Sequence, residues 1–174
     1  DGRKMYAYHF EGYWKDVGTI SSLWEANMEV LDPEHSGINL FDENWKIYSR
    51  NSGMTGHKIG SNAVVENCMI TDGCRIDGNV KHSILFSGVK VEKGAKIEDA
   101  VVMGGTVIKA GAVVEHCIVA ENVVIGENAI VGSMPKDEED GVATIGSGIT
   151  IGKGAKIGPN AMVNKNVEDG EEQW

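Results

Sequence analysis

Aliphatic residues return at every sixth position over most of residues 59–163, with a small or slender residue two places before each. A period of six matches neither the 3.6-residue repeat of a helix nor the alternation of a strand. It is typical of a β-solenoid whose coils have three short sides, each placing one aliphatic residue inside and ending in a tight corner. The aliphatic positions are Ile59, Val65, Ile70, Ile76, Leu85, Val91, Ile97, Met103, Ile108, Val114, Val119, Ile125, Val131, Ile145, Ile151, Ile157 and Val163.

Glycine and asparagine recur between these positions, and both suit corners that need a positive φ. At three hexads per coil, the array predicts about five coils of about eighteen residues, with parallel strands ~4.8 Å apart. Steps of five, and one step of nine between Ile76 and Leu85, are interpreted as irregular corners. Residues 132–144 interrupt the repeat with a proline and four consecutive acidic residues, which predicts a protruding, solvated loop.

The composition changes near residue 58. Nine of the eleven aromatic residues precede this point, and thin coils have little space for large rings. The sequence therefore predicts four parts, namely residues 1–31, a linker over 32–58, the array over 59–167 with its loop 132–144, and a tail over 168–174. The tail is expected to be mobile unless Trp174 docks on the last coil.

Two elements are predicted before the array. Residues 3–10 alternate and are rich in aromatics, which indicates a strand. An amphipathic helix of about twelve residues follows, with Thr19 or Ser21 as N-cap and an end at Asp32-Pro33. Its apolar face is predicted to contain Ile20, Leu23, Trp24, Met28 and Leu31.

A strand and one helix cannot form a domain alone, because each must bury an apolar face against another layer. The sequence is therefore expected to be the carboxy-terminal part of a longer protein, with residues 1–31 closing a missing domain. Within the linker, residues 45–48 form an apolar extended piece. This piece is expected to pack on another part of the molecule.

The net charge is −10 and the sixteen basic residues are dispersed. Nucleic acid and anionic membranes bind clustered Lys and Arg, so neither is expected as a partner. Cys68, Cys74 and Cys117 all occupy small-residue positions of the repeat. Packing as small hydrophobic side chains is favoured over a redox or metal role, and an odd number of thiols suits a reducing compartment such as the cytoplasm.

The strongest chemical signal is the run Tyr-Trp-Lys-Asp-Val-Gly-Thr at residues 13–19. Asp16 places a carboxylate on the turn before the helix, between an aromatic residue and a Gly-Thr helix start. Such an arrangement can hold a hard divalent cation beside a phosphate. The structural alternative is that Asp16 is only a turn residue and Trp14 only part of a core, and the spacing alone leaves both interpretations open.

Trp-x-Asp-x-Gly-Thr followed by a helix is similar to the closing motif of the catalytic domain in sugar-phosphate nucleotidylyltransferases. Residues 11–28, 44–48 and 80–86 resemble the bacterial glucose-1-phosphate adenylyltransferase (ADP-glucose pyrophosphorylase) family, and a carboxy-terminal hexapeptide solenoid completes the resemblance. The resemblance covers essentially the whole chain. It implies an all-β dominant fold, a left-handed parallel β-helix preceded by a strand-helix remnant of an α/β nucleotidyltransferase domain.

That family joins ATP and glucose 1-phosphate to give ADP-glucose and pyrophosphate for glycogen-type storage. The resemblance implies that Asp16 is one of two carboxylates on a Mg²⁺ ion and that Trp14 borders the sugar pocket. The glycine-rich nucleotide loop, the second metal carboxylate and the sugar-phosphate lysine have no counterpart here. No catalytic set is complete, so this chain alone is expected to be inactive.

The resemblance also implies assembly and regulation. The parent enzyme is expected to be a homo-oligomer, a tetramer built through its solenoids, with a sugar-phosphate or nucleotide effector. The Trp-x-Asp-x-Gly-Thr form favours the catalytic type of subunit. Enteric-type members carry several arginines in the stretch matching residues 107–117, where this chain has Lys109, Glu115 and His116. This departure leaves the effector unassigned.

Three other functions fit parts of the sequence. A hexapeptide-repeat acyltransferase needs a histidine base, but the two histidines of the array, His82 and His116, are expected to be solvated corner residues. A zinc enzyme of the carbonic anhydrase type needs three convergent histidines. A non-catalytic assembly module needs no chemistry of its own. Neither rival enzyme explains residues 13–19 and the helix after them.

Overall fold

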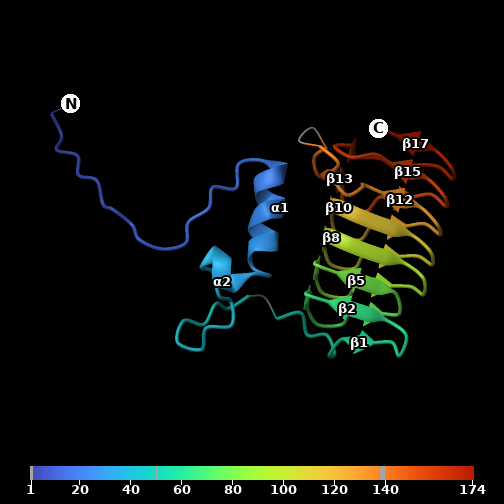
Figure 1. The fold of residues 1–174 in the computed structure, drawn as a ribbon, viewed down its shortest axis with the longest axis horizontal. Coiled ribbons are helices and arrows are strands. Elements are labelled where there is room, and N and C mark those ends of the chain that lie inside the picture. Colours follow the sequence, from blue (N-terminus) through green and yellow to red (C-terminus); the bar gives the residue numbers. More distant parts are fainter. Residues whose placement is uncertain (1, 50, 138–139) are drawn as a thin grey trace.

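The structure is a computed structural model that describes residues 2–49, 51–137 and 140–174. The array forms a parallel β-solenoid of about seven turns, stacked from β1 beside the linker to β17 at the C-terminus (Figure 1). The predicted β-solenoid is confirmed, but the prediction of about five coils is wrong. Lys58 pairs with Arg75 and Arg75 with Lys90, so these coils take 17 and 15 residues rather than eighteen.

Each coil has three sides. The first side is formed by β1 (Lys58–Ile59), β4 (Arg75–Ile76), β7 (Lys90–Val91), β9 (Val107–Ile108), β11 (Val124–Ile125) and β14 (Thr150–Ile151). The second is formed by β2 (Val64–Glu66), β5 (Asn79–Lys81), β8 (Lys96–Val102), β10 (Val113–Val119), β12 (Ile130–Val131), β15 (Lys156–Ile157) and β17 (Glu172–Gln173). The third is formed by β3 (Met69–Ile70), β6 (Ile84–Leu85), the second halves of β8 and β10, β13 (Ala143–Ile145) and β16 (Met162–Val163).

The interior of the solenoid confirms most predicted positions, although Ile59, in the first coil, is 44% exposed and lies outside the core. Two further positions are corrected. Val102 is fully buried and pairs with Leu85, whereas Met103, which was assigned to the interior, lies outside it. Val80 fills the interior position inside the predicted nine-residue step. Both corrections concern apolar residues that lie beside a predicted repeat position or at one that the prediction skipped. The sequence alone locates the repeat positions only approximately.

The corner between the second and third sides is regular rather than irregular. Interior residues there are usually five positions apart, as from Ile97 to Val102. The chain turns in successive coils through one residue with positive φ, and these residues are Asn67, His82, Asp99, His116 and Gly132. The predicted corner positions of the two histidines are therefore confirmed.

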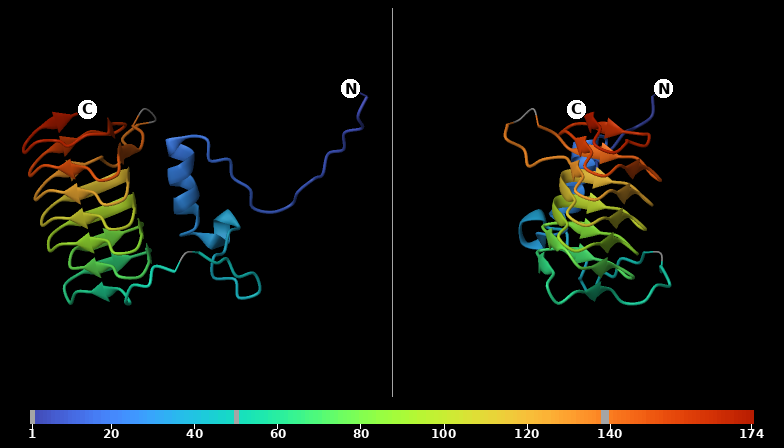
Figure 2. Two further views of the ribbon diagram at one scale, coloured as in Figure 1. Left: turned by 180° about the vertical axis from the view of Figure 1, so that it is seen from behind. Right: turned by 90° about the vertical axis from the view of Figure 1, so that its right-hand side faces the viewer.

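Helix α1 (Ile20–Glu29) lies along the third side of the solenoid (Figures 1 and 2). Thr19 is the N-cap, as expected, and its hydroxyl accepts the Ser22 N–H at 3.1 Å. The predicted apolar face is confirmed, and it packs on outward-facing side chains of β8 and β10. The contact joins Ile20, Leu23, Trp24, Met28 and Leu31 to Val101, Met103, Ile118 and Val142.

Trp24 connects α1 to the five-residue corner. Its indole Nε1–H donates to the carbonyl of Asp99 at 2.8 Å, and its ring centroid lies 4.4 Å from that of His116. His116 is consequently buried, which corrects the expectation of a solvated side chain. Its Nδ1 atom is buried without a hydrogen-bond partner among the described residues. We call this contact, made by Trp24, Asp99 and His116, the helix–corner joint.

Residues before the solenoid differ from the predictions in three ways. No strand forms over residues 3–10, because an extended segment needs a partner strand and none lies beside it in this structure. A short helix, α2 (Pro33–Ser36), follows α1 and was not predicted. Residues 45–48 do not pack as expected, since Trp45 is 78% exposed and Tyr48 86% exposed.

The loop and the tail extend the solenoid further than expected. Val142 and Ala143, near the end of the predicted loop, are buried against α1 and the core respectively. Residues 172–173 pair with β15, and Val167 is buried, so the parallel ladder continues into the predicted tail. Within the described ranges, no helix is long and apolar enough to cross a bilayer.

Trp24→Phe keeps an aromatic ring in the joint but removes the donor to the Asp99 carbonyl. The free energy of unfolding should fall by about 1 kcal/mol, the usual net value of such a hydrogen bond. Urea denaturation measures the change. Trp45→Phe is the matched control and should have no effect, because that ring is exposed; equal stability of the two variants would contradict the joint.

His116 predicts a pH dependence of stability. Burial lowers the pKa of His116, against the opposing effect of Asp99 and Asp140. The unfolded chain therefore binds this proton first as the pH falls, so the free energy of unfolding should decrease from about pH 7.5 to about pH 5.5. His116→Asn tolerates the positive φ and cannot titrate. The decrease should be smaller in this variant, and an equal decrease in both proteins would refute the assignment.

Candidate functional site

Residues 13–19 lead into α1 without forming a strand, and burial alternates along residues 13–16, with Tyr13 and Lys15 half-buried and Trp14 and Asp16 exposed. Two side chains of this segment contact α1. The Tyr13 hydroxyl donates to Glu29 Oε2 at 2.6 Å, and Lys15 Nζ lies 2.7 Å from Glu29 Oε1 and 2.9 Å from Glu25 Oε2. The segment is therefore attached to the outer flank of the helix that packs on the solenoid.

Charge and hydrogen bonding shift the titration of this cluster. Hydrogen bonds to Glu29 and then Glu25 raise the pKa of Lys15, and Lys15 followed by Tyr13 lowers the pKa of Glu29. The same carboxylate raises the pKa of Tyr13. At neutral pH Tyr13 is thus a neutral phenol, Lys15 a protonated amine and Glu29 a carboxylate.

Trp14 and Asp16, the two site residues predicted from the sequence, alternate with Tyr13 and Lys15 along the segment. Trp14 is 75% exposed and Asp16 is also exposed. In the described part of the chain, no hydrogen bond or ion pair engages the Asp16 carboxylate. The structure therefore leaves both side chains available on the side of the segment that α1 does not cover.

Asp16 suits Mg²⁺ as one ligand but does not form a complete metal site. Mg²⁺ is commonly held by one or two carboxylates together with phosphate oxygens and water, and the unengaged carboxylate of Asp16 can supply one such oxygen. Across residues 2–49, 51–137 and 140–174, no group of three His, Cys, Asp or Glu side chains is arranged to hold a metal ion.

The two histidines of the array differ in exposure. His82 Nδ1 lies 2.5 Å from Asp99 Oδ1, and its side chain is 35% exposed. His116 is covered by Trp24. Acyl transfer of the hexapeptide type needs a histidine that reaches the acceptor group. His116 is not presented in that way, and the partly exposed His82 is paired with Asp99.

The cysteines pack as the sequence predicts. Cys74 and Cys117 are buried, Cys68 is half-buried, and none of the three forms a disulfide. Burial is the main cause that raises the pKa of each thiol. Protonated thiols are poor nucleophiles, so these residues fill the interior rather than react.

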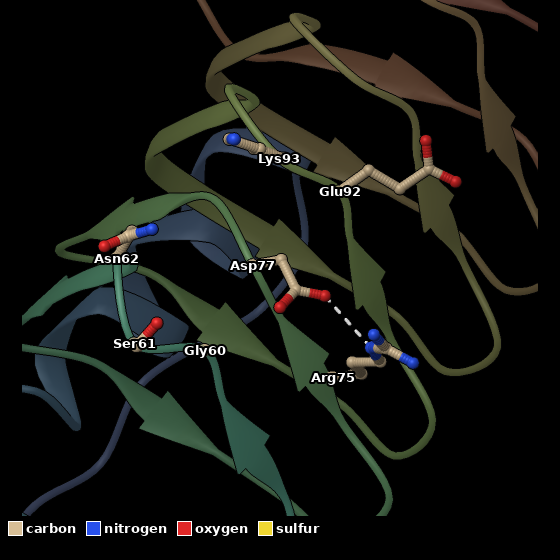
Figure 3. Close-up of a pocket in the computed structure, with 7 residues that line it drawn as sticks. All are labelled: Gly60, Ser61, Asn62, Arg75, Asp77, Glu92 and Lys93. Carbon is tan, nitrogen blue, oxygen red and sulfur yellow. Dashed lines mark hydrogen bonds and ion pairs between the residues drawn. The ribbon is translucent and has the colours of Figure 1, made fainter.

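A hollow at the linker end of the solenoid is lined by Gly60, Ser61, Asn62, Arg75, Asp77, Glu92 and Lys93 (Figure 3). Three of its four charged side chains, Arg75, Asp77 and Glu92, are already engaged. Arg75 Nε donates to Asp77 at 3.0 Å, and Glu92 accepts from Lys109 and from the Ala110 N–H. Glu92 and Lys93 point in opposite directions (Figure 3). The hollow therefore lacks the convergent polar groups of a ligand site.

Sequence reasoning missed the residues that hold the candidate site in place. Tyr13 and Lys15 were treated only as neighbours of Trp14 and Asp16, and Glu29 was not singled out. A signal was present, because Glu25 and Glu29 are four residues apart and so share one side of the helix. Tyr13 and Lys15, which alternate with Trp14 and Asp16, could then have been matched to the side of the helix that carries the two glutamates.

Two protein families match this chain. Residues 52–152 match the family described as GlmU-like, C-terminal hexapeptide, and residues 1–33 match the nucleotidyl transferase family. The first match covers the solenoid up to β14. The second covers residues 13–19, α1 and the start of α2.

Similar curated proteins are named glucose-1-phosphate adenylyltransferase. Those of Bacillus mycoides strain KBAB4 and Bacillus cereus strain ATCC 10987 are each 56% identical over 94 residues, and that of Bacillus anthracis is 55% identical over 94 residues. The matched region is 54% of this chain and 25% of each relative, so the chain spans about a quarter of the length of these relatives. On the solenoid and the match over residues 52–152, the chain belongs to the GlmU-like C-terminal hexapeptide family.

Proposed function

We propose that this chain is the carboxy-terminal part of a catalytic-type glucose-1-phosphate adenylyltransferase, which makes ADP-glucose and pyrophosphate from ATP and glucose 1-phosphate. One observation carries the proposal. The Trp-x-Asp-x-Gly-Thr segment is attached through α1 to a hexapeptide solenoid in a single chain. Relatives of 55–56% identity that bear this enzyme name support it.

Asp16 and Trp14 have separate roles in the proposed enzyme. The Asp16 carboxylate is one oxygen ligand of Mg²⁺, and the exposed Trp14 ring forms one wall of the sugar pocket. When bound, the metal ion neutralises charge on the phosphates. In-line phosphoryl transfer depends mainly on positioning, so this segment contributes by holding a carboxylate and an apolar surface at fixed places. The remaining nucleotide and sugar-phosphate groups belong to the rest of the enzyme.

The solenoid has an assembly and regulatory role in the proposal. His116 is covered and the three cysteines pack in or against the core, whereas the stacked coils give a support for α1. We infer a cytoplasmic homotetramer that responds to a sugar-phosphate or nucleotide effector and serves glycogen-type storage. The sequence departures at Lys109, Glu115 and His116 leave the effector to be identified by experiment.

The proposed reaction is tested with the full-length protein that carries this sequence. Purified with Mg²⁺, ATP and glucose 1-phosphate, it should release pyrophosphate and form ADP-glucose, measured by coupled assay and chromatography. The 174-residue chain under the same conditions should form none. ADP-glucose synthesis by the short chain would contradict its predicted inactivity, and its absence with the full-length protein would contradict the function.

Asp16→Asn in the full-length protein keeps the shape of the side chain but removes its charge. The rate of ADP-glucose formation should fall by roughly 100-fold, because a metal ligand and its charge are lost. Asp42→Asn is the matched control. Asp42 accepts the Asn44 N–H at 2.8 Å, which an asparagine can also do, so the rate should be unchanged. Equal rates for the two variants would remove Asp16 from the metal site.

The proposed self-association is tested on the 174-residue chain by light scattering at micromolar concentration. We expect a mass above 18.7 kDa, the mass of one chain, because the parallel ladder leaves unpaired strand edges at both ends of the solenoid. A strictly monomeric mass over the whole concentration range would count against assembly through this part of the protein.

A further inference from the structure

Helix α1 makes contacts on two of its sides. Its apolar residues, including Leu23, Trp24 and Met28, contact the solenoid. At 3.6 residues per turn, Glu25 and Glu29 lie on a different side of the helix. That side contacts residues 13–15, so the helix lies between the solenoid and the segment that carries Trp14 and Asp16.

Glu29 is the centre of the contact between α1 and this segment. Its two carboxylate oxygens engage different partners, with Oε2 accepting from the Tyr13 hydroxyl at 2.6 Å and Oε1 lying 2.7 Å from Lys15 Nζ. Glu25 contacts Lys15 alone, at 2.9 Å. Glu29 is the more enclosed of the two, with its side chain 32% exposed against 52% for Glu25. In the described part of the chain, no other carboxylate bridges both residues.

Burial alternates along residues 13–16, so the contact at Tyr13 and Lys15 also affects Trp14 and Asp16. Successive side chains of an extended segment point to opposite sides. Fixing Tyr13 and Lys15 against α1 therefore fixes Trp14 and Asp16 on the other side. A shift of one residue would bring Trp14 and Asp16 against Glu29, and a carboxylate at position 16 would then repel it.

We propose that Glu29 is a positioning residue for Trp14 and Asp16. It touches neither side chain, and acts by holding Tyr13 and Lys15 through a charge-assisted pair of contacts. The proposed position of these two residues in the reaction rests on the proposed function, whereas the ordering of residues 13–16 by Glu29 does not. The helix–corner joint then places the same segment relative to the solenoid.

Backbone dynamics of the 174-residue chain test the ordering directly. The measurement is the ¹⁵N heteronuclear NOE of the Trp14 and Asp16 amides, with α1 as the rigid reference and Tyr8, which is 89% exposed, as the loose one. We expect values close to those of α1 in the unchanged protein. In Glu29→Gln they should fall towards that of Tyr8, while α1 and the thermal midpoint stay unchanged.

Glu34→Gln is the matched control. Glu34 is exposed and has no hydrogen bond or ion pair in the described part of the chain, so the same chemical change should leave residues 13–16 ordered. If Glu29→Gln gives the same NOE values as Glu34→Gln, the ordering role is overturned. Loss of order in α1 itself would also overturn it, since Glu29 would then support the helix rather than the segment.

The consequence for the reaction is tested in the full-length protein. Glu29→Gln should raise the Mg²⁺ concentration at half-maximal rate by roughly tenfold, because the Asp16 carboxylate is held less firmly. Glu34→Gln should leave it unchanged. An unchanged Mg²⁺ response in Glu29→Gln, with residues 13–16 disordered by NMR, would overturn the link to Asp16. If the unchanged full-length protein forms no ADP-glucose, the proposed function fails while the NMR result still decides the ordering.

Discussion

The structure depends on the burial of one aliphatic side chain per side in each coil of the solenoid. The few interior residues of one coil cannot stabilise that coil alone, so each coil is stable only when its neighbours bury the faces above and below it. Fully buried residues such as Ile76, Ile108 and Ile125 form one continuous core. This stacking builds the parallel ladder, and the ladder supports α1 and residues 13–19, which lie outside the solenoid.

The third side of the solenoid is where α1 packs. Val101 and Ile118 point away from the interior and would be exposed apolar residues without α1. Covering them fixes the helix, and the indole of Trp24 fixes its position along the corner by donating to Asp99. The carboxylates on the other side of the helix then hold Tyr13 and Lys15. The solenoid core thus supports the corner, the corner supports α1, and α1 supports the candidate site.

The fold was largely predictable because its core has a period. A six-residue repeat identified the solenoid, and Thr19 was a recognisable cap. Periodicity does not distinguish Val102 from its neighbour Met103, and it did not reveal Val80 inside a nine-residue gap. The coil count was too low because coils of 15 and 17 residues are shorter than the expected eighteen, and because the ladder continues through β17, beyond the predicted array.

The candidate site was predictable only in part. Trp14 and Asp16 were found from a motif, but the residues that hold them were not, because side chains far apart in sequence meet only through the fold. His116 shows the same limit. Its burial follows from Trp24, which is distant in sequence, so no local pattern indicates it. Contacts between α1 and the solenoid are long-range, and a single sequence contains no direct record of them.

The central claim is that docking on the solenoid holds α1, and with it the segment that carries Asp16. Amide hydrogen exchange of the Leu23–Met28 region in the 174-residue chain tests this most directly, because an isolated ten-residue helix is marginal in water. We expect strong protection of these amides that is reduced in Trp24→Phe. Exchange at the rate of an unfolded peptide, while the amides of β8 and β10 remain protected, would contradict it.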